Sequence, residues 1–210
     1  MMRTYPLVLL VFSLVISLAG CSLLPAPEAA PRQLQLTSLT TTPGDSQIEH
    51  SSPFNLVIER PRASLPLQQR ELWYSQQPFY LQPYSRYLWA ESLDRQLQRL
   101  VSEFLAAQPW TTSVALDSPG IRSDLRLALT LHHWYLDVPR QKLMIGLQMN
   151  LLDHQGHSLL QRNWQGEEAV NPVSPPGLAA ASQRWLQAWA DELAGLLFQL
   201  QQDGMQLKEE

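Results

Sequence analysis

The sequence has little cysteine and little charge, and it lacks the short motifs that mark most catalytic sites. Cys21 is the only cysteine among 210 residues, so no intrachain disulfide can form and stability must come from a hydrophobic core. Charged residues make up 16% of the chain, and the 15 Lys and Arg are scattered without forming a basic stripe, which argues against a nucleic-acid partner. The chain contains no nucleophile elbow, no His-Glu-x-x-His zinc motif and no phosphate-binding glycine loop. We therefore expect no catalytic residues and no enzyme activity.

The five histidines do not form a pattern typical of metal ligands. His132 and His133 are adjacent in a predicted strand, so their side chains should point to opposite faces and could not hold one ion together. His154 and His157 flank a predicted turn, where Asp153 is the only nearby third ligand, and a solvated turn is the favoured interpretation. We expect neither a bound metal nor a dissociable cofactor.

The N-terminal residues have the layout of an export signal. Arg3 is followed by an uncharged apolar run over residues 6–18, and two small residues then precede Cys21. The run is about thirteen residues long, which is too short to cross a bilayer as a helix. A small-residue site that ends on cysteine resembles the bacterial lipobox, which implies that residues 1–20 are a cleaved signal peptide and that Cys21 becomes an acylated N-terminus. The alternative is a plain signal peptide, or a short anchor, that happens to stop at a cysteine.

Acylation of Cys21 would make the protein a membrane-anchored domain, because two or three acyl chains at ~0.8 kcal/mol per CH₂ hold a protein almost irreversibly. In such lipoproteins an aspartate after the cysteine favours retention at the inner membrane. Ser22 stands there instead, so the resemblance implies the periplasmic face of the outer membrane. The expected organisation is a lipidated linker at 21–31, a single periplasmic domain at 32–200 and a frayed polar tail at 201–210.

Hydrophobic periodicity predicts an α+β fold. Apolar residues spaced by three and four predict amphipathic helices at 89–107 and 178–200. Alternating patterns predict strands, most strongly in two long segments that short turn sequences should join into an antiparallel meander. The predicted strands are 32–39, 54–59, 70–75, 79–81, 111–116, 124–136, 142–152 and 158–166. We expect a mostly antiparallel or mixed sheet, with both helices packed on the one face that carries the leucines.

A short stretch near the middle of the chain is denser in aromatic residues than a core needs. Some of these side chains should be core residues, and we expect part of the cluster to form an exposed contact surface for a partner. The candidate partner-binding residues are Trp73, Tyr74, Phe79, Tyr80, Tyr84 and Tyr87.

The residues that follow this cluster resemble a known family. Leu88-Trp89-Ala90-Glu91-Ser92-Leu93-Asp94-Arg95-Gln96-Leu97, after a predicted strand rich in tyrosine, is similar to the hallmark stretch of the ABC-type transport auxiliary lipoproteins, which include the PqiC-like intermembrane transport lipoproteins. In that family a tryptophan opens the first helix and a proline follows about three positions later. Ser92 stands at the proline's place here and is a suitable helix-capping residue. The segment 150–156 also looks like a hairpin of the family, and the resemblance covers about residues 30 to 200.

The resemblance implies a non-catalytic component of a lipid-transport system. Its expected partner is the MCE-domain protein of an ABC transporter that moves lipids between the inner and outer membranes, and its acyl anchor would lie in outer-membrane lipid. A homo-oligomer is compatible with the family, and the sequence leaves the oligomeric state open. The alternative function is a periplasmic carrier that binds lipid in a cavity of its own between helices and sheet. The leucine and tryptophan stripes argue that this space is filled.

Overall fold

Three long strands form one side of the sheet in the computed structural model, which describes residues 29–41, 54–121 and 123–206. They are β7 (Leu125–Asp137), β8 (Lys142–Asp153) and β9 (Ser158–Ala169), and they pair antiparallel in chain order. On one face of β8 every second side chain is buried, from Leu143 to Leu151, as the period-two pattern requires. The predicted antiparallel meander is confirmed.

The other edge of β7 is paired by three short strands in succession. β2 (Phe54–Ile58), β3 (Arg62–Ala63) and β4 (Glu71–Ser75) each run parallel to it. Pro61 separates the first two, and Pro66 lies in the single-turn helix α2 (Leu65–Gln68) before the third. Proline has no N–H to donate, so each one interrupts the ladder along β7.

The remaining strands extend this half of the sheet outwards. β6 (Thr111–Leu116) runs parallel to β2, β5 (Gln82–Trp89) runs antiparallel to β4, and β1 (Arg32–Leu34) runs parallel to β5. The described residues therefore contain a nine-stranded mixed sheet with three helices, which confirms the predicted α+β class.

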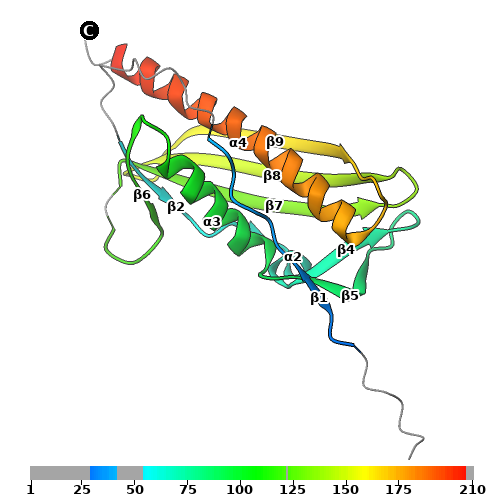
Figure 1. Ribbon diagram of the computed structural model, residues 1–210. Helices are drawn as coiled ribbons and strands as arrows, with labels where there is room; N and C mark the ends of the chain where they lie inside the picture. Colours follow the sequence, from blue (N-terminus) through cyan, green and yellow to red (C-terminus); the bar gives the residue numbers. More distant parts are fainter. Residues whose placement is uncertain (1–28, 42–53, 122, 207–210) are drawn as a thin grey trace, which may run out of the picture. The chain divides into compact units, whose positions relative to one another are not determined.

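Two long helices lie on one face of the sheet (Figure 1). α3 (Leu93–Ala106) packs on β6 and β2, and α4 (Pro175–Gln206) packs on β9 and β8. Four tryptophans fill the space between α4 and the sheet. Trp185 and Trp189 of α4 stack at 6.1 Å between ring centroids, with Trp134 of β7 and Trp164 of β9 against their edges at 5.8 Å. Among the described residues, indole rings therefore occupy much of the space between α4 and the sheet. No helix among the described residues has both the length and the apolar character needed to cross a membrane.

Several predicted boundaries were wrong. Residues 79–81 are a hairpin loop and not a strand, and the strand that follows is β5, which the sequence did not predict. Trp89 ends that strand instead of opening a helix, although its side chain is still buried in the core. The helix begins at Leu93, after Ser92 at the N-cap position, whose side chain makes no capping hydrogen bond. α4 is longer than predicted at both ends and extends to Gln206.

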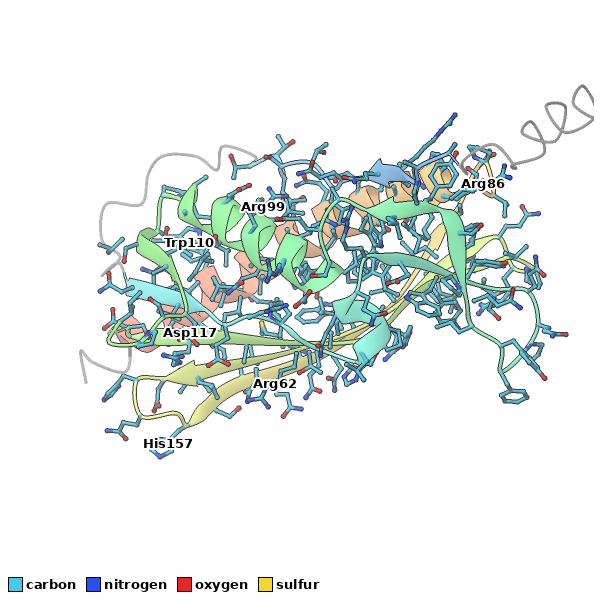
Figure 2. All side chains as sticks on the ribbon, turned by 90° about the horizontal axis from the view of Figure 1, so that it is seen from below. Arg62, Arg86, Arg99, Trp110, Asp117 and His157 are labelled. Atoms are coloured by element: carbon cyan, nitrogen blue, oxygen red, sulfur yellow. The ribbon has the colours of Figure 1, made fainter. Side chains whose placement is uncertain are left out.

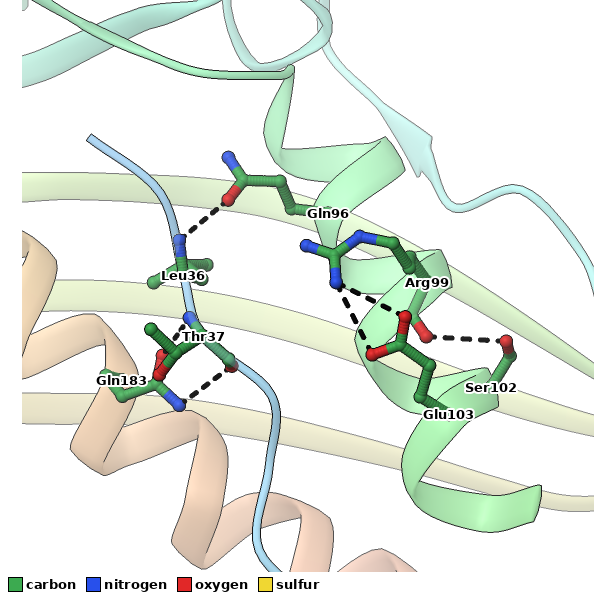
Figure 3. A network of polar contacts seen from close by, with 7 residues as sticks. All are labelled: Leu36, Thr37, Gln96, Arg99, Ser102, Glu103 and Gln183. Carbon is green, nitrogen blue, oxygen red and sulfur yellow. Dashed lines mark hydrogen bonds and ion pairs between the residues drawn. The ribbon is translucent and has the colours of Figure 1, made fainter. Parts of the chain in front are cut away.

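Of the first predicted strand, 32–39, only residues 32–34 form a strand, which is β1. After Leu34 the chain crosses between α3 and α4 as an extended strap, residues 35–41, held by glutamine side chains (Figure 3). The N–H of Leu36 donates to Gln96 Oε1 at 2.9 Å, and Thr37 exchanges two hydrogen bonds with the amide of Gln183. A glutamine amide offers the same donor and acceptor as a peptide group. The alternating pattern that predicted a strand therefore describes an extended segment whose hydrogen-bond partners are side chains.

Candidate functional site

The aromatic cluster of the sequence lies on the β4–β5 hairpin. Four of its six residues pack partly against the core: Trp73, Tyr74, Tyr84 and Tyr87. The rings of Tyr74 and Tyr84 lie 4.4 Å apart, and burial raises the pKa of the Tyr84 hydroxyl, with Tyr74 adding to the rise. Trp73 Nε1 donates to the Pro66 carbonyl at 3.0 Å. These contacts shape the hairpin and leave the four side chains partly exposed.

Phe79 and Tyr80 differ from the other four because they occupy the tip of the hairpin, where nothing covers them. Phe79 is fully exposed at 104%, Tyr80 is 60% exposed, and Leu81 beside them is 45% exposed. We call these three residues the tip. Among the described residues it is the only place where three exposed large apolar side chains are consecutive.

The backbone of the tip is strained in a way that presents the Phe79 ring. Tyr80 N–H donates to the Gln77 carbonyl at 3.3 Å, with Pro78 second in the turn and Phe79 third at a φ of +69°. A turn with proline second and positive φ third usually has glycine at the third position, because a side chain there costs about 1–2 kcal/mol. Phe79 adopts this unfavourable conformation although its ring packs against no described residue of the core cluster. Such an outlier is a reason to look for a function at the tip.

The tip and the beginning of the folded domain lie at the same end of the sheet. Arg32 of β1 pairs with Tyr87 of β5, and because the two strands are parallel, the chain before Arg32 leaves in the direction of the hairpin. The end of β7 and the start of β8 lie beside the end of β4, where Val138 N–H donates to the Ser75 carbonyl at 2.9 Å. We call this end, which carries the tip, the tether end. Figure 2 shows Arg86 at this end, and Asp117 and His157 toward the opposite one.

The opposite end, which we call the far end, holds a groove and three exposed apolar side chains. The groove encloses about 470 Å³ beside the β8–β9 turn and is lined by Asn55, Ile121, Ser123, Asp124, Arg126 and His154. Arg126 bridges Asp117 and Glu59 at 2.6 and 3.1 Å, and these hydrogen bonds raise its pKa. The exposed apolar residues at this end are Ile121, which lines the groove, Leu116 of β6 and Leu159 of β9. No signal in the sequence singled out this surface, because its residues come from four separate segments.

A third surface feature is a cavity of about 300 Å³ at the N-terminal end of α3, lined partly by Arg60, Arg70 and Arg95. Arg60 Nε lies 2.6 Å from Oδ2 of Asp94, whose carboxylate is 1% exposed. Arg70 donates to the Trp89 carbonyl at 2.8 Å. These two arginines are therefore engaged in holding the start of the helix, and we assign no ligand to the cavity.

The expectation that His132 and His133 face opposite sides of the sheet was wrong. A β-bulge between Leu131 and His133 adds a residue to β7, and both Leu131 and Trp134 are buried in the core. The two histidines between them consequently lie together on the face away from the helices. His132 Nε2 is 3.3 Å from Gln148 Oε1, while the His133 ring lies over Gly146. Burial lowers the pKa of His133, and His132 lowers it further.

His154 and His157 lie in the solvated β8–β9 turn. His157 Nδ1 is 3.2 Å from Asp153 Oδ2, and the other oxygen of that carboxylate accepts the N–H groups of Gln155 and His157. Asp153 thus organises the turn. Within the described ranges no group of three or more His, Cys, Asp or Glu side chains is arranged to hold a metal.

The residues that carried the lipobox resemblance, including Cys21, lie outside the described residues. Residues 34–194 match the family of ABC-type transport auxiliary lipoprotein components. The chain belongs to this family. The predicted family resemblance is therefore confirmed. The family match describes the function only as that of an ABC-type transport auxiliary lipoprotein component.

Two solved structures share the fold of this auxiliary lipoprotein. The crystal structure of protein XCC0632 from Xanthomonas campestris, assigned to the family DUF330, is 22% identical and superposes with a TM-score of 0.71 over 82% of this chain and 99% of that one. A second crystal structure, of an uncharacterized protein, is 16% identical with a TM-score of 0.64 over 80% and 99% of the two chains. At these identities the likeness establishes the fold alone. Among curated protein sequences, none matches.

Proposed function

We propose that this auxiliary lipoprotein is a non-catalytic, stationary dock of an MCE-type ABC system that moves lipids between the inner and outer membranes. The observation that carries the proposal is the family match over residues 34–194. The lipobox-like sequence ending at Cys21 supports an acyl anchor, and Ser22 after it supports the outer membrane. The tryptophan-filled space between α4 and the sheet supports a dock over a lipid carrier.

The anchor sets where the dock can work. Ten residues, 22–31, separate Cys21 from Arg32. Fully extended, ten residues span about 33 Å, and as a flexible chain they average about half of that. The domain therefore stays close to the leaflet that holds its acyl chains and does not cross the periplasm.

The far end of the sheet is the surface that we propose for the partner. The chain enters the domain at the tether end, so an anchored domain directs that end to the membrane and its far end into the periplasm. An MCE-domain protein that spans the periplasm would meet the far end first. The groove beside the β8–β9 turn offers mainly polar side chains together with Ile121, and exposed Leu116 and Leu159 add apolar contact area at this end of the sheet.

A photo-crosslinking amino acid at Leu159 tests the partner assignment in intact cells. We expect it to capture an MCE-domain protein, identified by mass spectrometry. The matched control is Leu65, which is more exposed, at 73%, but lies on α2 away from the groove. Capture of the MCE protein equally from both positions, or from Leu65 alone, would contradict docking at the far end.

The anchor is tested separately from the partner. With globomycin, we expect the precursor to accumulate, and without it the mature N-terminus should be a triacylated Cys21 in the outer-membrane fraction. Cys21→Ala should release the domain from that fraction. A mature N-terminus at any other residue would remove the anchor and with it the proposed role.

A further inference from the structure

We propose that the tip of the β4–β5 hairpin, residues Phe79, Tyr80 and Leu81, inserts into the phospholipid surface to which the protein is anchored. The inference rests on the proposed acylation of Cys21. It adds a second membrane contact, made by the folded domain itself, which would fix the orientation of the domain on the membrane.

The first argument is the chemistry of the tip. Phe79 is fully exposed, and Tyr80 and Leu81 are 60% and 45% exposed. A phenylalanine and a leucine beside a tyrosine combine apolar side chains with one that has an apolar ring and a polar hydroxyl. That combination is typical of the membrane–water interface, where tyrosine and tryptophan gather at the level of the headgroups.

The second argument is the conformation of Phe79. Its φ of +69° is one that glycine adopts readily and that phenylalanine rarely does. A fully exposed ring held in this conformation does nothing for the packed core. Contact with a lipid surface would give the ring an apolar environment that the domain itself does not supply.

The third argument is the path of the chain outside the folded domain. Arg32 pairs with Tyr87 near the tether end, and only ten residues, 22–31, connect it to Cys21. Those residues reach about 33 Å at most, so the acylated residue holds the tether end, and not the far end, near the lipid. The tip is the exposed apolar surface that this geometry brings to the membrane.

The fourth argument is the charge around the tip. At the tether end Arg184 of α4 pairs with Glu168 at 2.9 Å. Glu167 pairs with Arg140 and Lys142 at 2.6 Å each, and no ion pair of Arg86 occurs among the described residues. Anionic phospholipids attract such basic side chains.

The test uses the full-length acylated protein in vesicles of phosphatidylethanolamine and phosphatidylglycerol. Because Cys21 carries the lipid on its sulfur, Phe79→Cys introduces the only free thiol, which an environment-sensitive fluorophore can label. The vesicles contain lipids with a nitroxide quencher on the acyl chain. Leu159→Cys is the matched control, because Leu159 is also an exposed apolar residue, with 53% of its surface exposed, but lies at the far end.

We expect the label at Phe79 to be quenched about threefold more strongly than the label at Leu159, because only the tip enters the apolar layer. Adding Tyr80→Ser and Leu81→Ser to the Phe79→Cys protein should abolish most of that quenching, which separates insertion from mere proximity through the linker. Equal quenching at the two positions, no quenching at Phe79, or quenching that survives the serine substitutions overturns the proposal. A photo-crosslinker at Phe79 that captures a protein in cells instead of lipid also overturns it.

Mass spectrometry of the same preparations keeps the two proposals apart. If Cys21 is not acylated in cells, the proposed function fails. If Cys21 is acylated and the Phe79 label stays unquenched, the dock and its anchor stand and only the insertion of the tip is wrong.

Discussion

Two aromatic regions of this protein are built in opposite ways. Between α4 and the sheet, each tryptophan ring touches another ring, and Trp134 and Trp164 also donate their N–H groups to Ser182 and Glu192 at 2.9 Å. At the tip, Phe79 is fully exposed on a strained backbone. Aromatic residues of this chain therefore pack against one another in one region and are left exposed in the other. Substitutions should therefore affect unfolding in the first region and membrane contact in the second.

The largest effect is expected from Trp189, which is stacked on Trp185 and is 3% exposed. Trp189→Ala should lower the free energy of unfolding by about 3–5 kcal/mol, because a buried aromatic ring is replaced by a cavity. Its Nε1 has no hydrogen-bond partner among the described residues, so Trp189→Phe should lose less than about 1.5 kcal/mol. Urea denaturation of the purified protein measures both. An alanine variant as stable as the phenylalanine variant would show that the stack does not support the fold.

A smaller loss is expected at Gly166 of β9, which faces the same tryptophans. A Cβ atom there would lie 2.2 Å from Trp185 Nε1, so Gly166→Ala forces the indole to move and should destabilise the protein by about 1–3 kcal/mol. The matched control is Gly195 of α4, where a Cβ meets nothing within 4 Å. Gly195→Ala should stabilise by up to about 1 kcal/mol, since alanine favours a helix. In thermal unfolding we therefore expect a lower midpoint temperature for Gly166→Ala and a higher one for Gly195→Ala, each compared with the unchanged protein.

The strap gives an intermediate effect that contrasts a buried with an exposed amide. Gln96 is 0% exposed, and Gln96→Ala leaves the N–H of Leu36 without its partner, which should cost about 1–2 kcal/mol of unfolding free energy. Gln183 makes two hydrogen bonds to Thr37 where water can replace them, so Gln183→Ala should cost less than about 1 kcal/mol. Equal losses in urea denaturation would mean that burial does not decide the strength of the strap.

At the tip, in contrast, we expect removal of an aromatic side chain to cause no loss of stability. Phe79→Gly removes the side chain from a residue with φ of +69°, so the unfolding free energy should stay unchanged or rise by up to about 1 kcal/mol. The same substitution should weaken contact of the acylated protein with lipid, measured as increased hydrogen exchange of the hairpin on vesicles. A clear loss of stability would show that Phe79 packs against the domain after all.

The smallest effect is the pH dependence at His133. Burial and His132 hold its pKa below the ordinary value of about 6.5, so below that pH the unfolded chain binds more protons than the folded protein. The contribution of His133 to the free energy of unfolding is fully present above about pH 6.5 and decreases as the pH falls toward the lower pKa of the folded state. The loss should be less than about 1 kcal/mol, because the ring is half exposed. His133→Gln should flatten this part of the profile in urea denaturation series. A steeper decline in the variant would contradict the assignment.

Local pattern predicted much of the architecture. The period-two runs near 124–136 and 142–152 correspond to β7 and β8, and the helical stripes correspond to α3 and α4, because these periods directly reflect which face is buried. The strand 79–81 was wrong because exposed aromatic residues in a turn have the same composition as a short strand. The histidine pair was assigned to two faces because a β-bulge leaves no signal in the sequence.

The sequence by itself determined the family, the mixture of helices and sheet, and the density of aromatic residues before α3. Only the tertiary structure decided which aromatic residues are buried and that the tip lies at the end where the chain enters the domain. It also decided that the strap of residues 35–41 finds its partners in glutamines about 60 and 146 residues away. The physical reason is that periodicity reports the burial of a residue relative to its neighbours in the chain. Exposure, strain and the position of the tether depend on segments that meet only after folding.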